Sequence, residues 1–283
     1  MSRIAYVNGQ YLSHAHAGVH IEDRGYQFSD GIYEVCEVRD GKIIDMGGHL
    51  DRLERSANEL EINLPNRRKT IEIIVEEMRL KNRVQNGIVY IQVTRGVSPR
   101  NHLFPSPSTP ASMVMTAKST SREASDKKAA AGVSVITVPD NRWDRVDIKT
   151  VSLLPNILAK QKAHEAGAYE AWFVDADGDV TEGSSTNAWI VTQDNVLVTR
   201  DASRGILKGI TRGTTMTVAE NLQLKVEERR FTVEEAKQAK EAFITAATTI
   251  CMPIIQIDGQ PVGDGKVGEV SQRLRAHFHE HAG

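Results

Sequence analysis

The chain has 283 residues, of which 40% are hydrophobic and 25% charged, and its formal net charge at pH 7 is -2. A chain of this length can bury the core of one large domain or of two medium-sized ones, and the composition is that of a soluble globular protein. The sequence pI of about 6.5 argues against a surface for nucleic acid or membrane, which needs an excess of positive charge. We therefore expect a small-molecule ligand, with no nucleic acid and no membrane among the partners.

Cysteine usage and the N-terminus favour an intracellular enzyme or binding protein. The two cysteines, Cys36 and Cys251, lack the spacing of a zinc site or of a disulfide framework, so we predict two buried thiols and no metal site. The first residues do not have the pattern of a signal peptide, and no run approaches the roughly 18 apolar residues of a membrane span. A cytoplasmic protein is the expectation.

The first 120 residues have the pattern of hairpins followed by two amphipathic helices. Asn8-Gly9 and Asp40-Gly41 are turn pairs between short runs of β-forming residues. Apolar residues then recur at helical spacing. The predicted elements are strands at 4–7, 33–38 and 42–44, helices at 49–60 and 70–80, and strands at 88–93 and 112–115. The proline-rich loop from Pro99 to Pro110 is too long for a simple turn, and such loops are often functional.

Residues 118–131 carry almost no bulky apolar side chain, which is typical of a solvated connector. We predict a smaller N-terminal domain over 1–120, a linker at 121–131 and a larger C-terminal domain over 132–283. The elements expected in the second domain are strands at 133–138, 171–174, 188–191, 225–228, 242–245 and 254–257, and helices at 154–166, 211–222, 233–240 and 268–279. Because strands and helices do not alternate regularly, the predicted fold class is α+β, with mostly antiparallel sheets and flanking helices.

Lys149 and the run from Thr181 to Asn187 form the most informative pair in the chain. We expect Lys149 to lie on a short, largely apolar strand, where a lysine can be desolvated enough for its amine to attack a carbonyl. Glu182 lies beside a Gly-Ser turn, and a carboxylate held there can accept a hydrogen bond from a protonated ring nitrogen. Together they indicate an enzyme that forms a Schiff base. Taken singly, a lysine or glutamate is more often an ordinary solvated residue.

Further segments can bind anions. The stretch from Gly205 to Arg212 brings glycines to the start of a predicted helix, whose N–H groups and positive dipole end suit a phosphate. Arg52, on another predicted helix, can give a phosphate two parallel hydrogen bonds. Arg100 and His102 alternate in the proline-rich loop and can together hold a carboxylate. Each segment also has a structural explanation, as a helix cap, a solvated helix face or a mobile polar loop.

Taken in order, these residues resemble the pyridoxal-phosphate (PLP) aminotransferases of fold type IV, and within them the D-amino-acid aminotransferases. The resemblance covers nearly the whole chain. The matching segments are Glu22–Phe28 with Asp30–Glu34, His49–Leu53, Thr94–His102, Asp147–Lys149, Leu158–Gln161, Thr181–Ser185, Leu207–Arg212, and Ile257–Gly259 with Asp264–Glu269.

The resemblance implies a cofactor, pyridoxal 5'-phosphate, bound to Lys149 as a Schiff base, with Glu182 holding the ring nitrogen protonated. The remaining cofactor contacts that it implies come from Arg52, Leu207, Ile210, Thr211 and Thr248. Of these, Leu207 lies against the ring and the others hold the phosphate. Lys149 also moves the α-proton as general acid and base, which gives amino transfer in two half-reactions.

The resemblance also implies a substrate and a partner. Tyr33, Arg100 and His102 stand where D-specific members capture the substrate carboxylate, and the last two reach in from the partner subunit. We therefore expect a homodimer with shared active sites that acts on D-alanine or D-glutamate with 2-oxoglutarate or pyruvate. The stretch from Ser152 to Leu154 lacks a tyrosine that branched-chain relatives commonly carry, which favours the D-specific members.

Other activities use the same fold and cofactor. A branched-chain L-amino-acid aminotransferase, an amine transaminase and an aminodeoxychorismate lyase are the nearest alternatives, and the spacing of Arg100 and His102 speaks against them. An alternative of a different class is a non-catalytic PLP-binding protein, which would keep the phosphate site without a working nucleophile.

Overall fold

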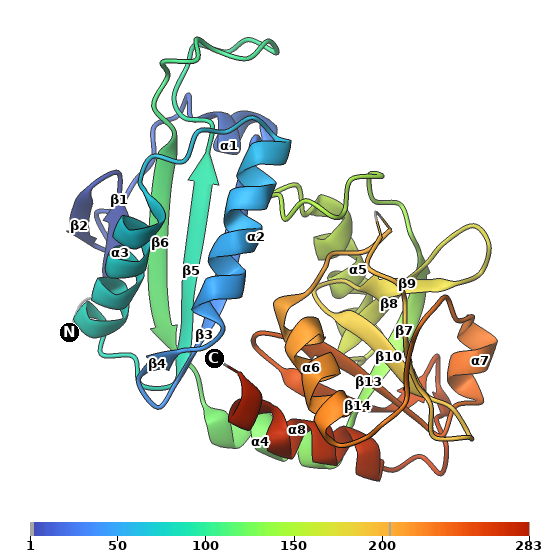
Figure 1. Ribbon diagram of the computed structural model, residues 1–283. Helices are drawn as coiled ribbons and strands as arrows, with labels where there is room; N and C mark the ends of the chain where they lie inside the picture. The colour runs from blue at the N-terminus through green and yellow to red at the C-terminus, as the bar shows by residue number, and fades with distance from the viewer. Residues whose placement is uncertain (1–2, 204, 283) are drawn as a thin grey trace. The chain divides into compact units, whose positions relative to one another are not determined.

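The computed structural model describes residues 3–203 and 205–282, which form two compact units. Unit 1 contains the described residues up to Arg122 together with Ile148–Ser152, and unit 2 contains Glu123–Asp147 and Leu153–Ala282. Most of the segment expected to be a linker forms helix α4 (Arg122–Ala131), whose alanines favour helix and whose Ala129 is buried. Each unit combines helices with a sheet, so the predicted α+β class is confirmed (Figure 1).

Unit 1 is built on an antiparallel sheet of six strands in the order β2-β1-β6-β5-β3-β4. Helices α2 and α3 cover one face of this sheet (Figure 1). Its elements are β1 (Ile4–Val7), β2 (Gln10–Ser13), α1 (Arg24–Phe28), β3 (Gly31–Arg39), β4 (Lys42–Ile43), α2 (Met46–Glu59), α3 (Arg68–Lys81), β5 (Gly87–Thr94) and β6 (Ser112–Ser119). The predicted strands and helices of this unit are all present, while β2 and α1 were not predicted.

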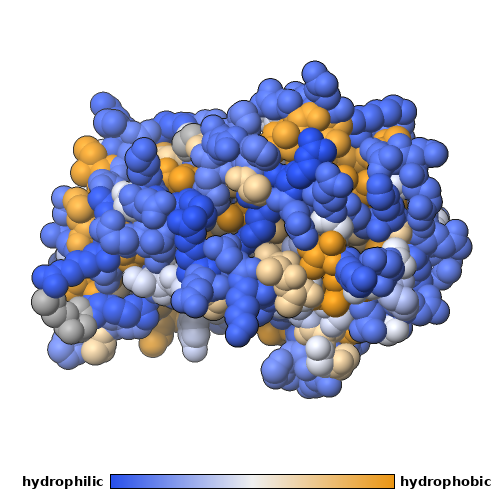
Figure 2. All heavy atoms as spheres, turned by 90° about the horizontal axis from the view of Figure 1, so that it is seen from below, coloured by the Kyte–Doolittle hydropathy of each residue, from blue (hydrophilic) through white to orange (hydrophobic). Residues whose placement is uncertain are grey.

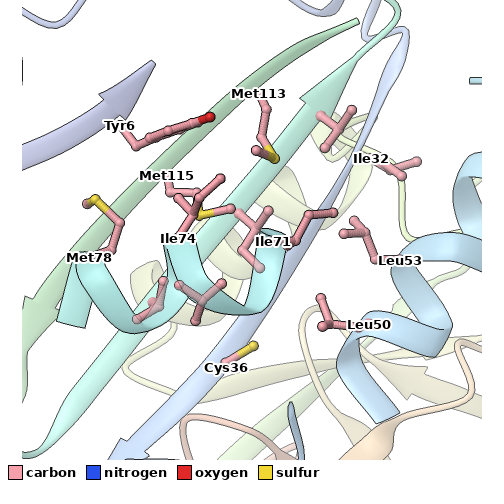
Figure 3. Packing of buried hydrophobic residues seen from close by; sticks show 14 of the residues in the cluster. Tyr6, Ile32, Cys36, Leu50, Leu53, Ile71, Ile74, Met78, Met113 and Met115 are labelled. Carbon is pink, nitrogen blue, oxygen red and sulfur yellow. The ribbon is translucent and has the colours of Figure 1, made fainter. Parts of the chain in front are cut away.

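The core of unit 1 follows from the alternation of its strands. In β3 every second side chain, from Ile32 to Val38, points inward, and the row meets Leu50 and Leu53 of α2. Figure 3 shows these side chains packed together with Ile71, Ile74 and Met78 of α3 and with Tyr6, Met113 and Met115 of the sheet. The inward row of β3 contains one charged residue, Glu34, which is fully buried. A carboxylate in such a place needs charged or hydrogen-bonding partners.

Unit 2 contains a mixed sheet of nine strands in which most strand pairs are antiparallel, as predicted. Strand β7 pairs in parallel with both β8 and β14, and β11 pairs in parallel with β12. The other strand pairs of this sheet are antiparallel. Its elements after α4 are β7 (Val133–Pro139), α5 (Leu154–Glu165), β8 (Glu170–Val174), β9 (Val180–Gly183), β10 (Asn187–Val191), β11 (Leu197–Thr199), α6 (Ile210–Asn221), β12 (Val226–Glu228), α7 (Val233–Lys237), β13 (Glu241–Ala246), β14 (Ile250–Ile257), β15 (Gln260–Pro261) and α8 (Glu269–His281).

The two faces of the second sheet are buried by different partners. In β8, Ala171 and Phe173 pack in one cluster with Ala159 and Ala163 of α5, whereas Trp172 points to the other face and contacts Phe231. Helices α6 and α8 pack against β13 and β14. Burial on both faces explains why β8, β10 and β13 are buried along almost their whole length and do not alternate.

The surface agrees with the polar composition. Hydrophilic residues predominate on the face drawn in Figure 2, with apolar residues in smaller patches, as the mean hydropathy of -0.36 leads one to expect. Both cysteines are buried free thiols, as predicted, and burial raises the pKa of each. Within residues 3–203 and 205–282, no helix is long and apolar enough to cross a membrane.

Candidate active site

Lys149 is fixed by hydrogen bonds of its main chain at the start of β3. The short strand that the sequence predicted around it does not form. Thr150 forms an isolated antiparallel bridge with Ile32. The Tyr33 N–H donates to the Lys149 carbonyl over 3.0 Å, and the Lys149 N–H donates to Ser56 Oγ over 3.4 Å. This arrangement places the Lys149 amine 4.2 Å from the centre of the Tyr33 ring. Two predicted site residues, one catalytic and one substrate-binding, therefore lie in contact.

The Tyr33 ring, which the Lys149 amine contacts, packs against a second tyrosine, Tyr90. The rings of Tyr33 and Tyr90 lie 5.7 Å apart on neighbouring strands, and the Tyr90 hydroxyl donates to Gln92 over 2.8 Å. Burial and the neighbouring Tyr33 raise the pKa of Tyr90 to about 12. Tyr90 is therefore a neutral phenol at working pH, and it supports the Tyr33 ring without adding a charge.

The guanidinium of Arg52 is hydrogen-bonded to the buried carboxylate of Glu34. Glu34 accepts hydrogen bonds from Arg52 Nε over 2.7 Å and from Arg52 Nη2 over 2.8 Å, and its second oxygen also contacts His49 Nδ1 at 2.8 Å. Burial alone would raise the pKa of Glu34, but Arg52 and His49 lower it to about 2. The charged pair is thus a fixed part of the interior, and it orients the guanidinium of a predicted phosphate ligand.

Arg52 and the lysine segment meet on one face of α2. Ser56 lies one helical turn after Arg52, so the two side chains project from the same face. Ser56 is the residue that accepts the hydrogen bond from the Lys149 N–H. Unit 1 therefore gathers three of the predicted site residues, Tyr33, Arg52 and Lys149, from three separate stretches of sequence.

Arg100 and His102 lie on the loop between β5 and β6, which extends beyond the ends of both strands (Figure 1). Arg100 Nη1 donates to Gln27 Oε1 over 3.3 Å. Phe28 is contacted by both predicted carboxylate ligands, with the Arg100 guanidinium 4.6 Å and the His102 ring 5.5 Å from its ring centre. The two side chains therefore share one aromatic support, and both remain largely exposed.

Glu182 of unit 2 is buried and surrounded by donors. One carboxylate oxygen accepts from Arg142 Nη1. The other accepts from Asn187 Nδ2 and from the Leu207 N–H, each over 3.1 Å. The Asn187 amide also donates to the Leu207 carbonyl over 2.9 Å, so one side chain ties Glu182 to the predicted ring-contact residue. Glu182 and Leu207 are thus brought together, as the resemblance implied.

Sequence reasoning missed the residues that support Glu182. Arg142 is held in turn by Asp140, which accepts from its Nε over 2.9 Å and from its Nη2 over 2.7 Å. Burial opposes the charge of each partner, yet their pairing lowers the pKa of Asp140 and raises that of Arg142. Asn187 closes the Thr181–Asn187 run and could have been noticed there. No local pattern distinguishes Arg142, because its partner lies 40 residues away.

Ile210 and Thr211 form the first turn of α6, as the anion-site prediction required. An α-helix leaves its first N–H groups without intrahelical acceptors, and its dipole favours a negative charge there. Gly209 precedes the helix in an extended conformation. A Cβ on Gly209 would lie 2.0 Å from Asn187 Oδ1, so only glycine allows the chain to approach Asn187 this closely. The helix start is thereby set beside the group that holds Glu182.

The Thr248 segment forms the turn between β13 and β14. Thr248 itself is exposed. Its neighbour Thr249 is buried, and the Thr249 hydroxyl has no hydrogen-bond partner in the described part of the chain. A buried hydroxyl without a partner is rare, so Thr249 is a candidate donor for a ligand at this turn.

These donors and acceptors fit pyridoxal phosphate. Unit 1 offers an amine over an aromatic ring and a guanidinium oriented by Glu34. Unit 2 offers an ordered carboxylate for a protonated ring nitrogen, followed within the same segment by the N–H groups of a helix start for a phosphate. Taken by itself, each unit thus offers groups of the kinds that hold pyridoxal phosphate.

Comparison with known proteins gives the family. Residues 31–257 match the family described as amino-transferase class IV. The chain is 39% identical over 277 residues to a D-alanine aminotransferase of Staphylococcus haemolyticus, covering 98% of this chain and 96% of that protein. It is 40% identical over 275 residues to one of Listeria innocua serovar 6a, covering 97% and 94%.

Solved structures agree on the fold. The branched-chain amino acid aminotransferase of T.th. with pyridoxamine 5'-phosphate superposes with a TM-score of 0.91 at 25% identity, covering 99% of this chain and 94% of that one. A branched-chain aminotransferase of Thermoproteus uzoniensis with norvaline gives a TM-score of 0.87 at 25% identity, with the same coverage. Fold and site thus define an enzyme that transfers amino groups. The chain belongs to the class IV aminotransferases, and the fold type IV resemblance is confirmed.

Proposed function

We propose that this aminotransferase uses pyridoxal 5'-phosphate to move the amino group of a D-amino acid, D-alanine or D-glutamate, to a 2-oxo acid. The observation that carries the chemistry is the Lys149 amine, 4.2 Å from the Tyr33 ring in a segment fixed by main-chain hydrogen bonds. The choice of D-amino acids is supported by curated relatives, named D-alanine aminotransferases, that match nearly the whole chain at about 40% identity.

When bound, the cofactor supplies an aldehyde carbon that takes up the amino group and a ring that draws electrons from the substrate's α-carbon. Lys149 is the residue that would hold the aldehyde carbon, and its Nζ would take the proton from the substrate's α-carbon. Glu182, oriented by Asn187 and the Leu207 N–H, would accept the hydrogen bond of the protonated ring nitrogen.

We assign the phosphate to the residues that the resemblance implies, Arg52, Ile210, Thr211 and Thr248. Arg52, held by Glu34, presents its guanidinium, and Ile210 and Thr211 present the N–H groups of a helix start. Thr248 and the unpartnered hydroxyl of Thr249 are the side-chain donors of the same turn. Because an anion is bound most tightly by donors that are already oriented, these groups would hold the phosphate, and the chemistry would be left to Lys149.

The substrate carboxylate is assigned to Arg100, His102 and Tyr33. A guanidinium and an imidazole on one loop can hold a carboxylate by charge-assisted hydrogen bonds, and the hydroxyl of a tyrosine adds a further donor. A branched-chain L-specific enzyme remains the second candidate, supported by the TM-score of 0.91 to the branched-chain enzyme of T.th.. That likeness concerns the fold that both kinds of enzyme share, whereas the D-alanine aminotransferases match in sequence over 98% of this chain.

The stereochemical proposal is tested by following pyruvate formation from D-alanine and, separately, from L-alanine, each with 2-oxoglutarate. We expect kcat/KM to favour D-alanine by roughly 100-fold or more, because a carboxylate site on one side of the substrate positions the α-proton for only one enantiomer. Bleaching of the cofactor's visible absorbance by D-alanine in the absence of an acceptor gives the same preference for the first half-reaction. A preference for L-alanine or L-leucine would contradict the D-specific assignment and favour the branched-chain alternative.

We propose further that the enzyme is a cytoplasmic homodimer in which Arg100 and His102 complete the active site of the partner. Support comes from apolar side chains that are exposed around the loop, Ile21, Tyr26, Leu103 and Phe104. Soluble proteins rarely expose several large apolar side chains close together. A second copy of the chain would cover them in a symmetric interface.

Mixing two impaired variants tests this arrangement, assayed at a D-alanine concentration well below the raised KM of Arg100→Ala. Lys149→Ala lacks the amine and Arg100→Ala lacks the carboxylate ligand. After dissociation and reassociation together, mixed dimers should contain one site with both residues intact, restoring about a quarter of wild-type activity when dimers form at random. Activity that stays at the level of the separate variants would show that Arg100 serves its own subunit, and sedimentation of the wild type as a monomer would exclude the dimer.

A further inference from the structure

The loop that carries Arg100 and His102 is anchored at its root by a buried arginine. Arg24, the first residue of α1, is only 4% exposed. Its Nη1 donates to the carbonyl of Asn101 over 2.6 Å and to the carbonyl of Leu103 over 3.2 Å. These two carbonyls flank His102. One guanidinium nitrogen therefore fixes the backbone on both sides of a proposed carboxylate ligand.

Arg24 is itself held by a carboxylate that it shares with a second buried arginine. Asp30 Oδ2 accepts from Arg24 Nε and from Arg95 Nε, each over 2.8 Å. Arg95 uses its remaining nitrogens to donate to the carbonyls of Leu60 and Glu61, just past the end of α2, over 2.7 and 3.0 Å. The loop is thereby tied, through Asp30, to the helix that carries the proposed phosphate ligand.

Phe28, the last residue of α1, supports the side chains of the same loop. The guanidinium groups of Arg24 and Arg100 lie 4.8 and 4.6 Å from the centre of its ring, and the ring of His102 lies at 5.5 Å. Cations prefer the face of an aromatic ring, and an aromatic pair at this distance is also favourable. Arg24 thus holds the backbone at residue 102 while Phe28 holds the side chains of Arg100 and His102.

We propose that Arg24 and Phe28 are positioning residues for the substrate carboxylate, which keep Arg100 and His102 in binding geometry before the substrate arrives. The proposal rests on the proposed function of Arg100 and His102. Loops without such anchors must lose conformational entropy when they bind, which weakens affinity. The sequence analysis singled out the segment from Glu22 to Phe28 without assigning it a role. The proposal gives this segment the role of positioning the loop that carries Arg100 and His102.

Two variants test the proposal. Arg24→Lys keeps the positive charge beside Asp30 but replaces a five-donor fork by one ammonium, which cannot hold both loop carbonyls in the same geometry. Phe28→Leu keeps an apolar side chain and removes the aromatic face. For each variant we expect KM for D-alanine to rise roughly tenfold to a hundredfold while kcat and the cofactor's visible absorbance stay close to those of the wild type.

Hydrogen exchange supplies a readout that does not depend on activity. In the free enzyme, the amides of residues 97–110 should exchange faster in Arg24→Lys than in the wild type. Arg79→Lys is the matched control, because Arg79 is a buried arginine of unit 1 that also donates to a main-chain carbonyl, that of Val84. This control should alter neither KM nor the exchange of the loop.

The outcomes separate this proposal from the function on which it rests. If Arg100→Ala leaves KM for D-alanine unchanged, the carboxylate role of Arg100 is wrong. If Arg100→Ala raises KM but Arg24→Lys and Phe28→Leu change neither KM nor the exchange of residues 97–110, only the positioning role is overturned. Faster exchange of the loop with an unchanged KM would also overturn the positioning role. If Arg24→Lys fails to fold, the KM of Phe28→Leu tests the positioning role instead.

Discussion

Replacing Lys149 with alanine is expected to lower kcat by at least roughly 10⁴-fold, since the substitution removes both the proposed covalent attachment and the proposed general base. The fold should survive. The segment is held by main-chain groups, through Tyr33 N–H to the Lys149 carbonyl and through the Lys149 N–H to Ser56, and alanine keeps both hydrogen bonds. The amine contacts the face of the Tyr33 ring, which is a modest stabilising interaction at a partly exposed position.

Two measurements connect the loss of activity to the amine. Borohydride reduction of the wild-type holoenzyme should leave the cofactor attached to the peptide that contains Lys149, and mass spectrometry of Lys149→Ala should find no such adduct at this position. Small primary amines added to the variant should restore part of the proton transfer, in proportion to their basicity, as general base catalysis requires.

A matched lysine variant completes this test. Lys118→Ala removes an exposed amine from β6 of the same unit and should change neither activity nor the site of the adduct. Lys149→Ala that turned over D-alanine as fast as the wild type would remove the basis of the proposed mechanism. An adduct on another lysine would move the catalytic centre elsewhere.

The sequence predicted elements best where one local pattern decides them. Strand β5 and helix α3 came within two residues of their observed ends, because alternation and helical spacing are visible in single stretches of chain. The segment around residue 125 was misread, since its short polar and alanine side chains suit a solvated connector as well as the helix that forms there. The parallel pairing of β7 with β8 and β14 was not predicted, because it depends on residues far apart in sequence.

The same distinction applies to the site. Lys149 and Glu182 were identified because each lies in a recognisable run. Their supporting partners were not, because no local signal distinguishes Asp140 or Arg142 from any other turn residue. Glu34 is instructive: in sequence it is one more polar position of an alternating strand, yet the register of β3 turns it inward, towards Arg52. Only the fold reveals that this carboxylate is a partner of a functional arginine.

The second large effect is expected for Glu34→Gln. The amide of glutamine offers one acceptor oxygen where the carboxylate offers two, and its NH₂ group points a donor at a guanidinium that has only donors. Breaking a buried ion pair by removing one partner typically costs about 3–5 kcal/mol, because the other charge is left buried without compensation. We therefore expect a loss of stability of this size, together with weaker cofactor binding, since Arg52 loses the group that orients it.

Glu37→Gln is the matched control for this substitution. Glu37 lies on the same strand but on its opposite, partly exposed face, so its replacement should change the free energy of unfolding by less than about 0.5 kcal/mol. Unfolding of unit 1 is best followed by tyrosine near-UV circular dichroism or by hydrogen exchange of β3. Tryptophan fluorescence is unsuitable, because all three tryptophans, Trp143, Trp172 and Trp189, belong to unit 2.

The pH dependence of stability identifies the ionised carboxylate as the cause. The folded protein holds the pKa of Glu34 at about 2, below the ordinary value of 4.5 that applies after unfolding. Because the folded value is the lower one, the contribution of Glu34 is fully present above pH 4.5 and is lost as the pH falls towards 2. Acidification therefore changes stability in the same direction as Glu34→Gln, because both remove the negative charge beside Arg52.

The wild type should therefore lose stability more steeply than Glu34→Gln between pH 4.5 and 2, and the two proteins should approach each other at the acid end. A ligand stabilises the folded protein by an amount that grows with its affinity. Because we expect Glu34→Gln to bind the cofactor more weakly, added pyridoxal phosphate should raise the stability of this variant less than that of the wild type. Parallel pH profiles for the two proteins would instead mean that Glu34 contributes through packing and not through its charge.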